Sequence, residues 1–265
     1  MAEPALGSAP EPSRLELPGM SLLEHLEELR RRIIYALLAV LVAFGAAWAY
    51  AEAIFQVMER PIKEALRANQ LGEKLVYTNP TDPFNIYLRI ALIAGLFLAS
   101  PVVLYQLWMF VSPGLYRHEK RYILPFLFAT VGLFLAGGYF GYRYVYPAAL
   151  TFLINYGKDF TPMITVGEYT DLFLTVVVGM GVVFELPTLI FFLALMGVVD
   201  ARFLASNFRY AVLGIFVVSA ILTPTTDLVN LCMFAAPMIV LYTVSIGIAW
   251  FVHPKRRRKE LEAEA

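Results

Sequence analysis

The stretch LYQLWMFVSPGLYRHEKR, residues 104–121, indicates both the class of this protein and the place of its functional surface. It begins inside a long apolar segment, and a Ser-Pro-Gly turn at residues 112–114 ends that segment. Proline has no amide hydrogen and glycine tolerates a positive φ, so a helix has to stop there. The loop that follows carries one acidic residue, Glu119, among basic ones. We therefore expect a polar recognition loop at the end of a membrane-spanning helix.

The composition excludes an ordinary soluble protein. Hydrophobic residues make up 59% of the chain and charged residues 16%, whereas a soluble domain has about 25% charged residues. The single cysteine, Cys232, rules out an intramolecular disulfide, and the three histidines lack metal-ligand spacing. The sequence also lacks a phosphate-binding glycine loop and the motifs of hydrolases. We expect no metal, no cofactor, no nucleic-acid partner and no bond chemistry.

Six apolar segments predict an all-α integral membrane protein with six transmembrane helices. A spanning helix needs about 20 apolar residues to cross a hydrocarbon core of about 30 Å. The fifth segment would be only about 21 Å long as a helix, so we expect the bilayer to thin around it. The predicted spans are residues 33–50, 85–111, 122–146, 169–199, 210–223 and 228–252.

The membrane domain is expected to cover residues 20–252, between a disordered tail at residues 1–19 and a charged tail at residues 253–265. An S-x-x-E capping box predicts a short amphipathic helix at residues 20–32, which can lie in the headgroup region. Between the first two spans, residues 52–69 have room for one or two short helices.

Two features inside the spans predict local structure. The motif Gly137-x-x-x-Gly141 in the third span would allow a close contact with another helix. In the fourth span, Glu185 and Pro187 are expected to interrupt the helix, because proline removes a backbone hydrogen bond.

The distribution of positive charge predicts the orientation in the membrane. Fourteen of the 21 Lys and Arg residues fall in residues 1–32, residues 114–121, residues 200–209 and the C-terminal tail. Positive charge stays on the cytoplasmic side. Both termini and the recognition loop should therefore be cytoplasmic.

Three acidic residues are candidates for function. Glu28 and Glu119 are both expected at the cytoplasmic face, where they are either solvated acids paired with neighbouring basic residues or receptors for two guanidinium groups. A carboxylate can bind a guanidinium through two parallel hydrogen bonds, which lysine cannot reproduce. Glu185 falls within a span, where a charged acid costs at least about 2.5–3.5 kcal/mol. It is either a protonated acid satisfied by a neighbouring helix or part of a functional polar pocket.

Several motifs resemble those of TatC, the polytopic subunit of the twin-arginine protein translocase. HLEELRRR at residues 25–32 resembles the HLxELRxR signature of that family, and residues 104–120 resemble its first cytoplasmic loop. FELP at residues 184–187 resembles its FE-x-P element in the fourth span. LTP at residues 222–224, followed by Asp227, resembles its LTPPD turn. The motifs occur in order across the six predicted spans, so the resemblance is specific.

This resemblance implies a concave bundle whose cytoplasmic face binds the twin-arginine motif of signal peptides on folded precursor proteins. Glu28 and Glu119 would receive the two arginines, and Arg30 and Phe110 would shape the same site. The other members of the site would be His25, Leu29 and Trp108.

The resemblance also implies partners and a location. The protein would work in a bacterial-type cytoplasmic (inner) membrane with single-span subunits of the TatA or TatB type and with other TatC copies, using the proton-motive force. Docking of the single-span partners is expected at Thr223, Pro224, Asp227 and Asn230. Pro61 would matter in the first periplasmic loop.

Two other classes of membrane protein are compatible with the sequence. A secondary transporter of a small solute would show inverted repeats with broken helices at matching positions. Prolines occur within spans at residues 101, 187 and 237, but without a convincing repeat. A membrane enzyme would need a base to partner the intramembrane acid, and the sequence suggests none.

Overall fold

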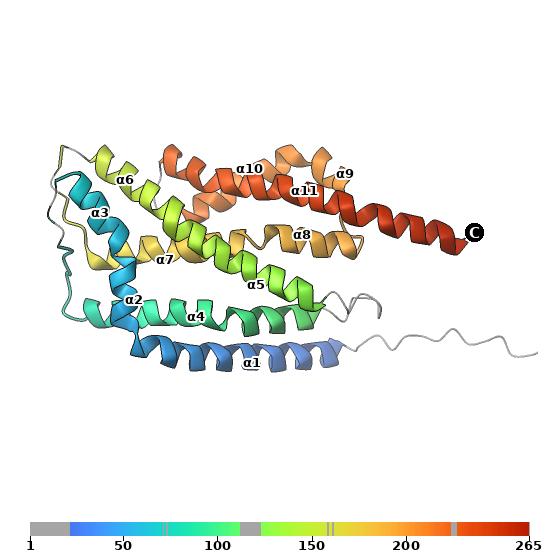
Figure 1. The fold of residues 1–265 in the computed structure, drawn as a ribbon, viewed down its shortest axis with the longest axis horizontal. Coiled ribbons are helices and arrows are strands. Elements are labelled where there is room, and N and C mark those ends of the chain that lie inside the picture. Colours follow the sequence, from blue (N-terminus) through green and yellow to red (C-terminus); the bar gives the residue numbers. More distant parts are fainter. Residues whose placement is uncertain are drawn as a thin grey trace, which may run out of the picture.

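The structure, a computed structural model, is a bundle of helices that run largely along one axis (Figure 1). It describes residues 22–70, 72, 74–111, 123–157, 159–160, 162–223 and 227–264. Within these ranges the β pairing consists of an isolated bridge between Val76 and Thr165, so the all-α prediction is confirmed. The elements are α1 (Leu22–Ala49), α2 (Ala51–Met58), α3 (Arg60–Ala68), α4 (Asp82–Val111), α5 (Ile123–Phe140), a π-helical turn (Gly141–Val145), α6 (Tyr146–Tyr156), α7 (Val166–Val183), α8 (Leu186–Leu195), α9 (Ala201–Ser206), α10 (Phe208–Leu222) and α11 (Leu228–Glu264).

The helices identify a protein that crosses a membrane several times. Among the described residues, four helical stretches are long and apolar enough to span a bilayer: Leu23–Ala49, Asp82–Phe110, Val166–Leu195 and Leu228–Phe251. α10 is apolar but shorter, as its sequence leads one to expect.

Several helices are longer than the predicted spans; α11, for example, continues to Glu264, beyond the span predicted to end at residue 252. α1 joins the expected amphipathic helix at residues 20–32 to the first span, because no glycine or proline lies between Leu22 and Phe44 to break it. The third apolar segment continues from α5 through the π-helical turn into α6 and ends only at Tyr156. Pro147 has no amide hydrogen to donate to the backbone hydrogen bond of an α-helix. The wider π-helical turn just before it lets the helical segment continue past the proline.

The fourth apolar segment is interrupted where its sequence predicts. α7 ends at Val183, and α8 begins at Leu186 with Pro187 in its first turn. The two halves together still form one stretch long enough to cross a membrane. The interruption leaves Glu185 between the two helices.

The glycine motif of the third span lies directly against α7, as its spacing predicts. A Cβ added at Gly137 would lie 2.5 Å from the carbonyl oxygen of Met180, and one at Gly141 would lie 3.1 Å from the carbonyl oxygen of Val176. The first distance excludes any side chain unless the backbone shifts, so Gly137 fixes how closely the two helices approach.

Small residues also line the contact between α1 and α4, which the sequence analysis did not single out. Ala43 and Ala47 on α1, and Ala91 and Gly95 on α4, are buried and spaced four residues apart. A Cβ at Gly95 would lie 2.8 Å from the backbone of Phe44. Such pairs of small residues let helices approach closely in a membrane. This antiparallel packing brings the first turns of α1 beside the last turns of α4.

The two ends of the bundle are built differently. α1 begins, α4 ends and α5 begins at one end, which we call the loop end (Figure 1). At the other end, the cap end, α2 and α3 lie across the bundle (Figure 1). Two tyrosine hydroxyls hold them in place: Tyr142 donates to the carbonyl of Val57 at 2.9 Å, and Tyr169 donates to the carbonyl of Met58.

Candidate functional site

Two of the motifs singled out in the sequence meet at the loop end. The imidazole of His25 stacks on the ring of Phe110, with 4.5 Å between the ring centroids and 24° between the planes. Deeper along the same pair of helices, Nη1 of Arg32 donates to Oε1 of Gln106 at 3.1 Å. These contacts fasten the start of α1 to the end of α4, and they place His25 and Phe110 in one site.

Glu28 lies between these two contacts on α1 and already holds a guanidinium group. Its Oε1 accepts a hydrogen bond from Nη2 of Arg32 at 3.0 Å. The side chain of Glu28 is 11% exposed and that of Arg32 is 16% exposed. Nε of Arg32 is buried and has no hydrogen-bond partner among the described residues. Glu28 is therefore a largely shielded acid in an ion pair rather than a solvated surface group.

The remaining residues expected at this surface are placed unequally. Arg30 is exposed on α1, and Leu29 is half-buried. Glu119 lies outside the described residues, as does the rest of the loop at residues 112–122. The structure therefore describes the α1 and α4 parts of the expected site.

Trp108 points into the bundle and away from the contact between His25 and Phe110. Its indole Nε1 donates to Oγ1 of Thr130 on α5 at 3.2 Å, and its ring meets the ring of Phe126 edge to face at 4.5 Å. Trp108 is buried. It packs the end of α4 against α5 and does not lie on the same surface as His25 and Phe110.

Glu185 is joined to Trp108 through one hydroxyl group. Oγ1 of Thr130 donates to Oε2 of Glu185 at 2.5 Å while it accepts from the indole of Trp108. Glu185 Oε1 and the hydroxyl of Thr188 are buried without a hydrogen-bond partner among the described residues. A neighbouring helix thus satisfies one oxygen of this intramembrane acid.

Replacing Thr130 by valine should destabilise the protein, because Trp108 and Glu185 would each lose a partner inside the bundle. An unsatisfied buried polar group costs about 1–3 kcal/mol. We expect a lower midpoint of thermal unfolding in detergent. Thr243→Val is the matched control, because Thr243 is exposed and its hydroxyl bonds only to the carbonyl of Ile239 among the described residues. Equal midpoints for the two variants would contradict this role of Thr130.

The described residues among those expected to dock partners lie at the end of α10 and the start of α11. The hydroxyl of Thr223 donates to the carbonyl of Ser219 at 2.6 Å. Asp227 accepts hydrogen bonds from the backbone amide of Asn230 at 2.7 Å and from its side chain at 2.9 Å. Thr223 and Asn230 are buried, and Pro224 lies outside the described residues. These hydrogen bonds therefore cap the end of α10 and the start of α11.

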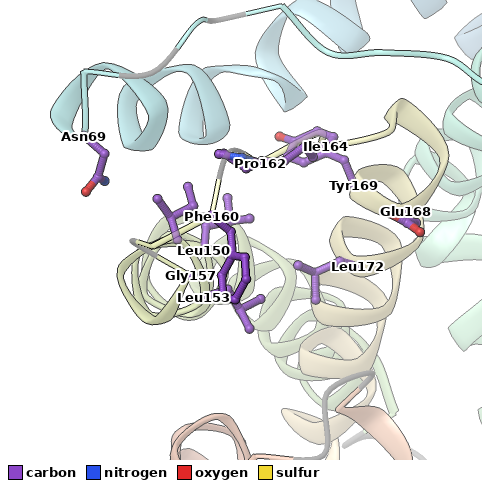
Figure 2. A pocket seen from close by; sticks show the side chains of 11 residues that line it. Asn69, Leu150, Leu153, Gly157, Phe160, Pro162, Ile164, Glu168, Tyr169 and Leu172 are labelled. Carbon is purple, nitrogen blue, oxygen red and sulfur yellow. The ribbon is translucent and has the colours of Figure 1, made fainter.

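A cavity of about 340 Å³ lies at the cap end, between the end of α3, α6 and the start of α7 (Figure 2). Its lining is mostly apolar, with Leu150, Phe160 and Leu172 among the lining residues and Glu168 at one side (Figure 2). The predicted site residues do not line it; Pro61 is buried in the first turn of α3. Among the described residues, no three His, Cys, Asp or Glu side chains lie together as a metal site would require.

Comparison with known proteins decides the family. The family model described as Sec-independent protein translocase protein (TatC) matches residues 24–237. The chain belongs to the TatC family. The motifs at the loop end, the broken fourth span and the turn before α11 all lie within the matched range.

Individual TatC proteins are similar over nearly their whole length. The chain is 62% identical to TatC of Koribacter versatilis over 252 residues, which cover 95% of this chain and 93% of that one. It is 39% identical to TatC of Carboxydothermus hydrogenoformans, over 89% of this chain and 95% of that one. A crystal structure described as the twin-arginine translocase receptor TatC is 36% identical, with a TM-score of 0.75 over 85% of this chain and 98% of that one.

Three residues of this TatC-family site were not singled out as functional from the sequence. Arg32 and Gln106 lie within recognised motifs, and the spacing of four residues between Glu28 and Arg32 is typical of an ion pair on a helix. Thr130 gave no signal, because it is a small polar residue in an apolar span and its partners come from α4 and from the break after α7.

Proposed function

We propose that this TatC-family protein is the signal-peptide receptor and core scaffold of a twin-arginine translocase. It binds the Arg-Arg motif of folded precursor proteins at the loop end of the bundle. It then assembles with single-span partner subunits, and export is driven by the proton-motive force. The protein carries out recognition and assembly rather than bond chemistry.

The observation that carries this proposal is the way Glu28 holds a guanidinium. A carboxylate that is largely shielded from water binds such a group more strongly than a solvated one, because the local dielectric constant is lower. The stacked rings of His25 and Phe110 lie beside it and offer an apolar surface to the rest of a peptide.

Glu119 supplies the second carboxylate in this proposal. α4 ends at Val111, next to Phe110 in the site. The chain from Val111 to Glu119 can extend at most about 28 Å, so Glu119 is within reach of the surface that presents Glu28. Two carboxylates from α1 and from the loop after α4 suit two adjacent arginines.

The orientation follows from charge and supports a cytoplasmic receptor. α1 begins and α11 ends at the loop end (Figure 1), and the sequence at these ends of the chain is rich in basic residues. The positive-inside tendency therefore supports a loop end and two termini in the cytoplasm of a bacterial-type inner membrane. Precursors that are already folded would meet the receptor on that side.

Partner subunits would assemble along α10 and the turn before α11. α10 is short for a bilayer and presents exposed apolar side chains, including Leu213, Val217 and Ile221. Single-span subunits of the TatA or TatB type, and further TatC copies, are the partners that we assign to this membrane-embedded surface.

Peptide binding to the detergent-solubilised protein tests the proposal. A labelled signal peptide with Arg-Arg should bind at least about tenfold more tightly than the same peptide with Lys-Lys, because an ammonium group lacks the planar pair of donors. A transporter or an enzyme would not distinguish the two. Equal affinity for both peptides would contradict the proposal.

A further inference from the structure

We propose that Arg32 is an internal competitor for Glu28, which an incoming arginine of the signal peptide has to displace. This inference rests on the proposed function and adds a regulatory residue to the same site. Arg32 then lowers the affinity of the receptor and speeds the release of its cargo.

The geometry of the pair leaves Glu28 only partly available. Nη2 of Arg32 lies 3.0 Å from Oε1 of Glu28, and a peptide arginine that binds through two parallel hydrogen bonds needs both carboxylate oxygens. Because both side chains are largely shielded from solvent, there is little room for a second guanidinium beside the first. Binding of the peptide arginine therefore requires Arg32 to leave Glu28.

Arg32 is held in a way that allows this exchange. Its Nη1 also donates to Gln106 on α4 at 3.1 Å, so a displaced side chain retains a partner next to the site. Its Nε is buried without a partner among the described residues. An arginine with an unsatisfied buried donor is bound less well than one whose donors are all paired, which makes Arg32 a displaceable occupant.

The exchange has a consequence for the kinetics of binding. While the peptide is bound, Arg32 stays near Glu28 through Gln106, and it can return as soon as the peptide arginine moves away. Loss of Arg32 should therefore speed association of the peptide, because no exchange has to precede binding, and slow its dissociation, because Arg32 no longer recaptures Glu28.

The test is peptide binding to full-length variants, with the dissociation rate measured for the same Arg-Arg peptide. Arg32→Gln should bind about three- to tenfold more tightly than the natural protein, the range expected when a partly shielded ion pair no longer competes. Arg32→Lys should show a smaller increase, because lysine keeps the charge but offers a weaker hold on the carboxylate. If Arg32→Gln fails to fold, the affinity of Arg32→Lys alone tests whether Arg32 competes for Glu28.

Two further variants separate competition from structural support. Gln106→Leu removes the hydrogen bond that Arg32 makes to α4 but leaves Arg32 paired with Glu28. This variant should therefore not bind the peptide more tightly. Lys63→Gln breaks a similar pair at the cap end, between Lys63 on α3 and Glu59, which immediately precedes that helix. This variant should leave the affinity unchanged.

The possible outcomes distinguish this inference from the proposed function. If the natural protein discriminates Arg-Arg from Lys-Lys but both Arg32 variants bind equally or more weakly, the competitor role is overturned and the receptor role stands. Tightening in Gln106→Leu as large as in Arg32→Gln would also overturn it, since looser packing of α1 on α4 would then be the cause. If the natural protein does not discriminate the peptides, the proposed function itself fails.

Discussion

Gly137→Ala should destabilise the protein strongly, whereas Gly132→Ala on the same helix should not. The added Cβ at position 137 would lie 2.5 Å from the carbonyl oxygen of Met180 and 2.7 Å from Cβ of Phe184. Neither the backbone nor a Cβ can turn aside, so α5 and α7 would have to separate. We expect a loss of about 3 kcal/mol or more, measured as a lower midpoint of thermal unfolding in detergent.

Gly132 is the matched control, because a Cβ there would meet nothing within 4 Å. Alanine is favoured over glycine inside a helix by roughly 0.5–1 kcal/mol, so Gly132→Ala should be neutral or slightly stabilising. Equal unfolding midpoints for the two variants would show that α5 and α7 are not as close as described.

The position of Gly137 also matters for the polar groups inside the bundle. Thr130 lies two helical turns before Gly137 on α5 and donates to Glu185 just beyond the end of α7. Separating the two helices would therefore also pull Thr130 away from Glu185. The substitution should therefore weaken the hydrogen bond from Thr130 to Glu185, in addition to its direct steric cost.

Much of the fold could be predicted from the sequence because a bilayer imposes simple requirements. Backbone groups in lipid must be paired within the segment, so long apolar stretches become helices. The break at Glu185 and Pro187 and the close contact at Gly137 followed from the chemistry of single residues. The continuation of the third span through α6 to Tyr156 could not be predicted from the sequence, because the span was expected to end before Pro147. The π-helical turn before Pro147 accommodates the proline, and the helix continues.

The candidate site was less predictable, because the direction of a side chain depends on its tertiary neighbours. Trp108 belongs to a motif of the recognition stretch, yet α5 offers it a hydroxyl acceptor and turns it inward. The spacing of Glu28 and Arg32 permits an ion pair, but only the approach of α4 with Gln106 explains why the pair is shielded. The partner of Glu185 lies on another helix, at Thr130, and no local pattern points to it.

Glu119→Gln should abolish binding of an Arg-Arg signal peptide while the protein still inserts and folds. Glu119 is the acidic residue of the stretch at residues 112–121. Removing one partner of a shielded charge pair leaves a peptide guanidinium unpaired, at a cost of roughly 2–5 kcal/mol. The affinity should therefore fall by at least about 30-fold.

Glu28→Gln should weaken the same binding by about tenfold, which is less than the effect at Glu119 because Arg32 already occupies part of the natural carboxylate. Glu27→Gln is the control: Glu27 is the neighbouring acid on α1 and is exposed. A substitution there should change the affinity by less than about twofold, as is usual for a surface charge.

The most direct test of the account is a titration of one labelled Arg-Arg peptide against the natural protein, Glu28→Gln and Glu119→Gln, each purified as a folded protein in the same detergent. We predict saturable binding to the natural protein, weaker binding to Glu28→Gln and no measurable binding to Glu119→Gln. Unchanged affinity in both glutamate variants would contradict the claim that paired carboxylates at the loop end hold the two arginines.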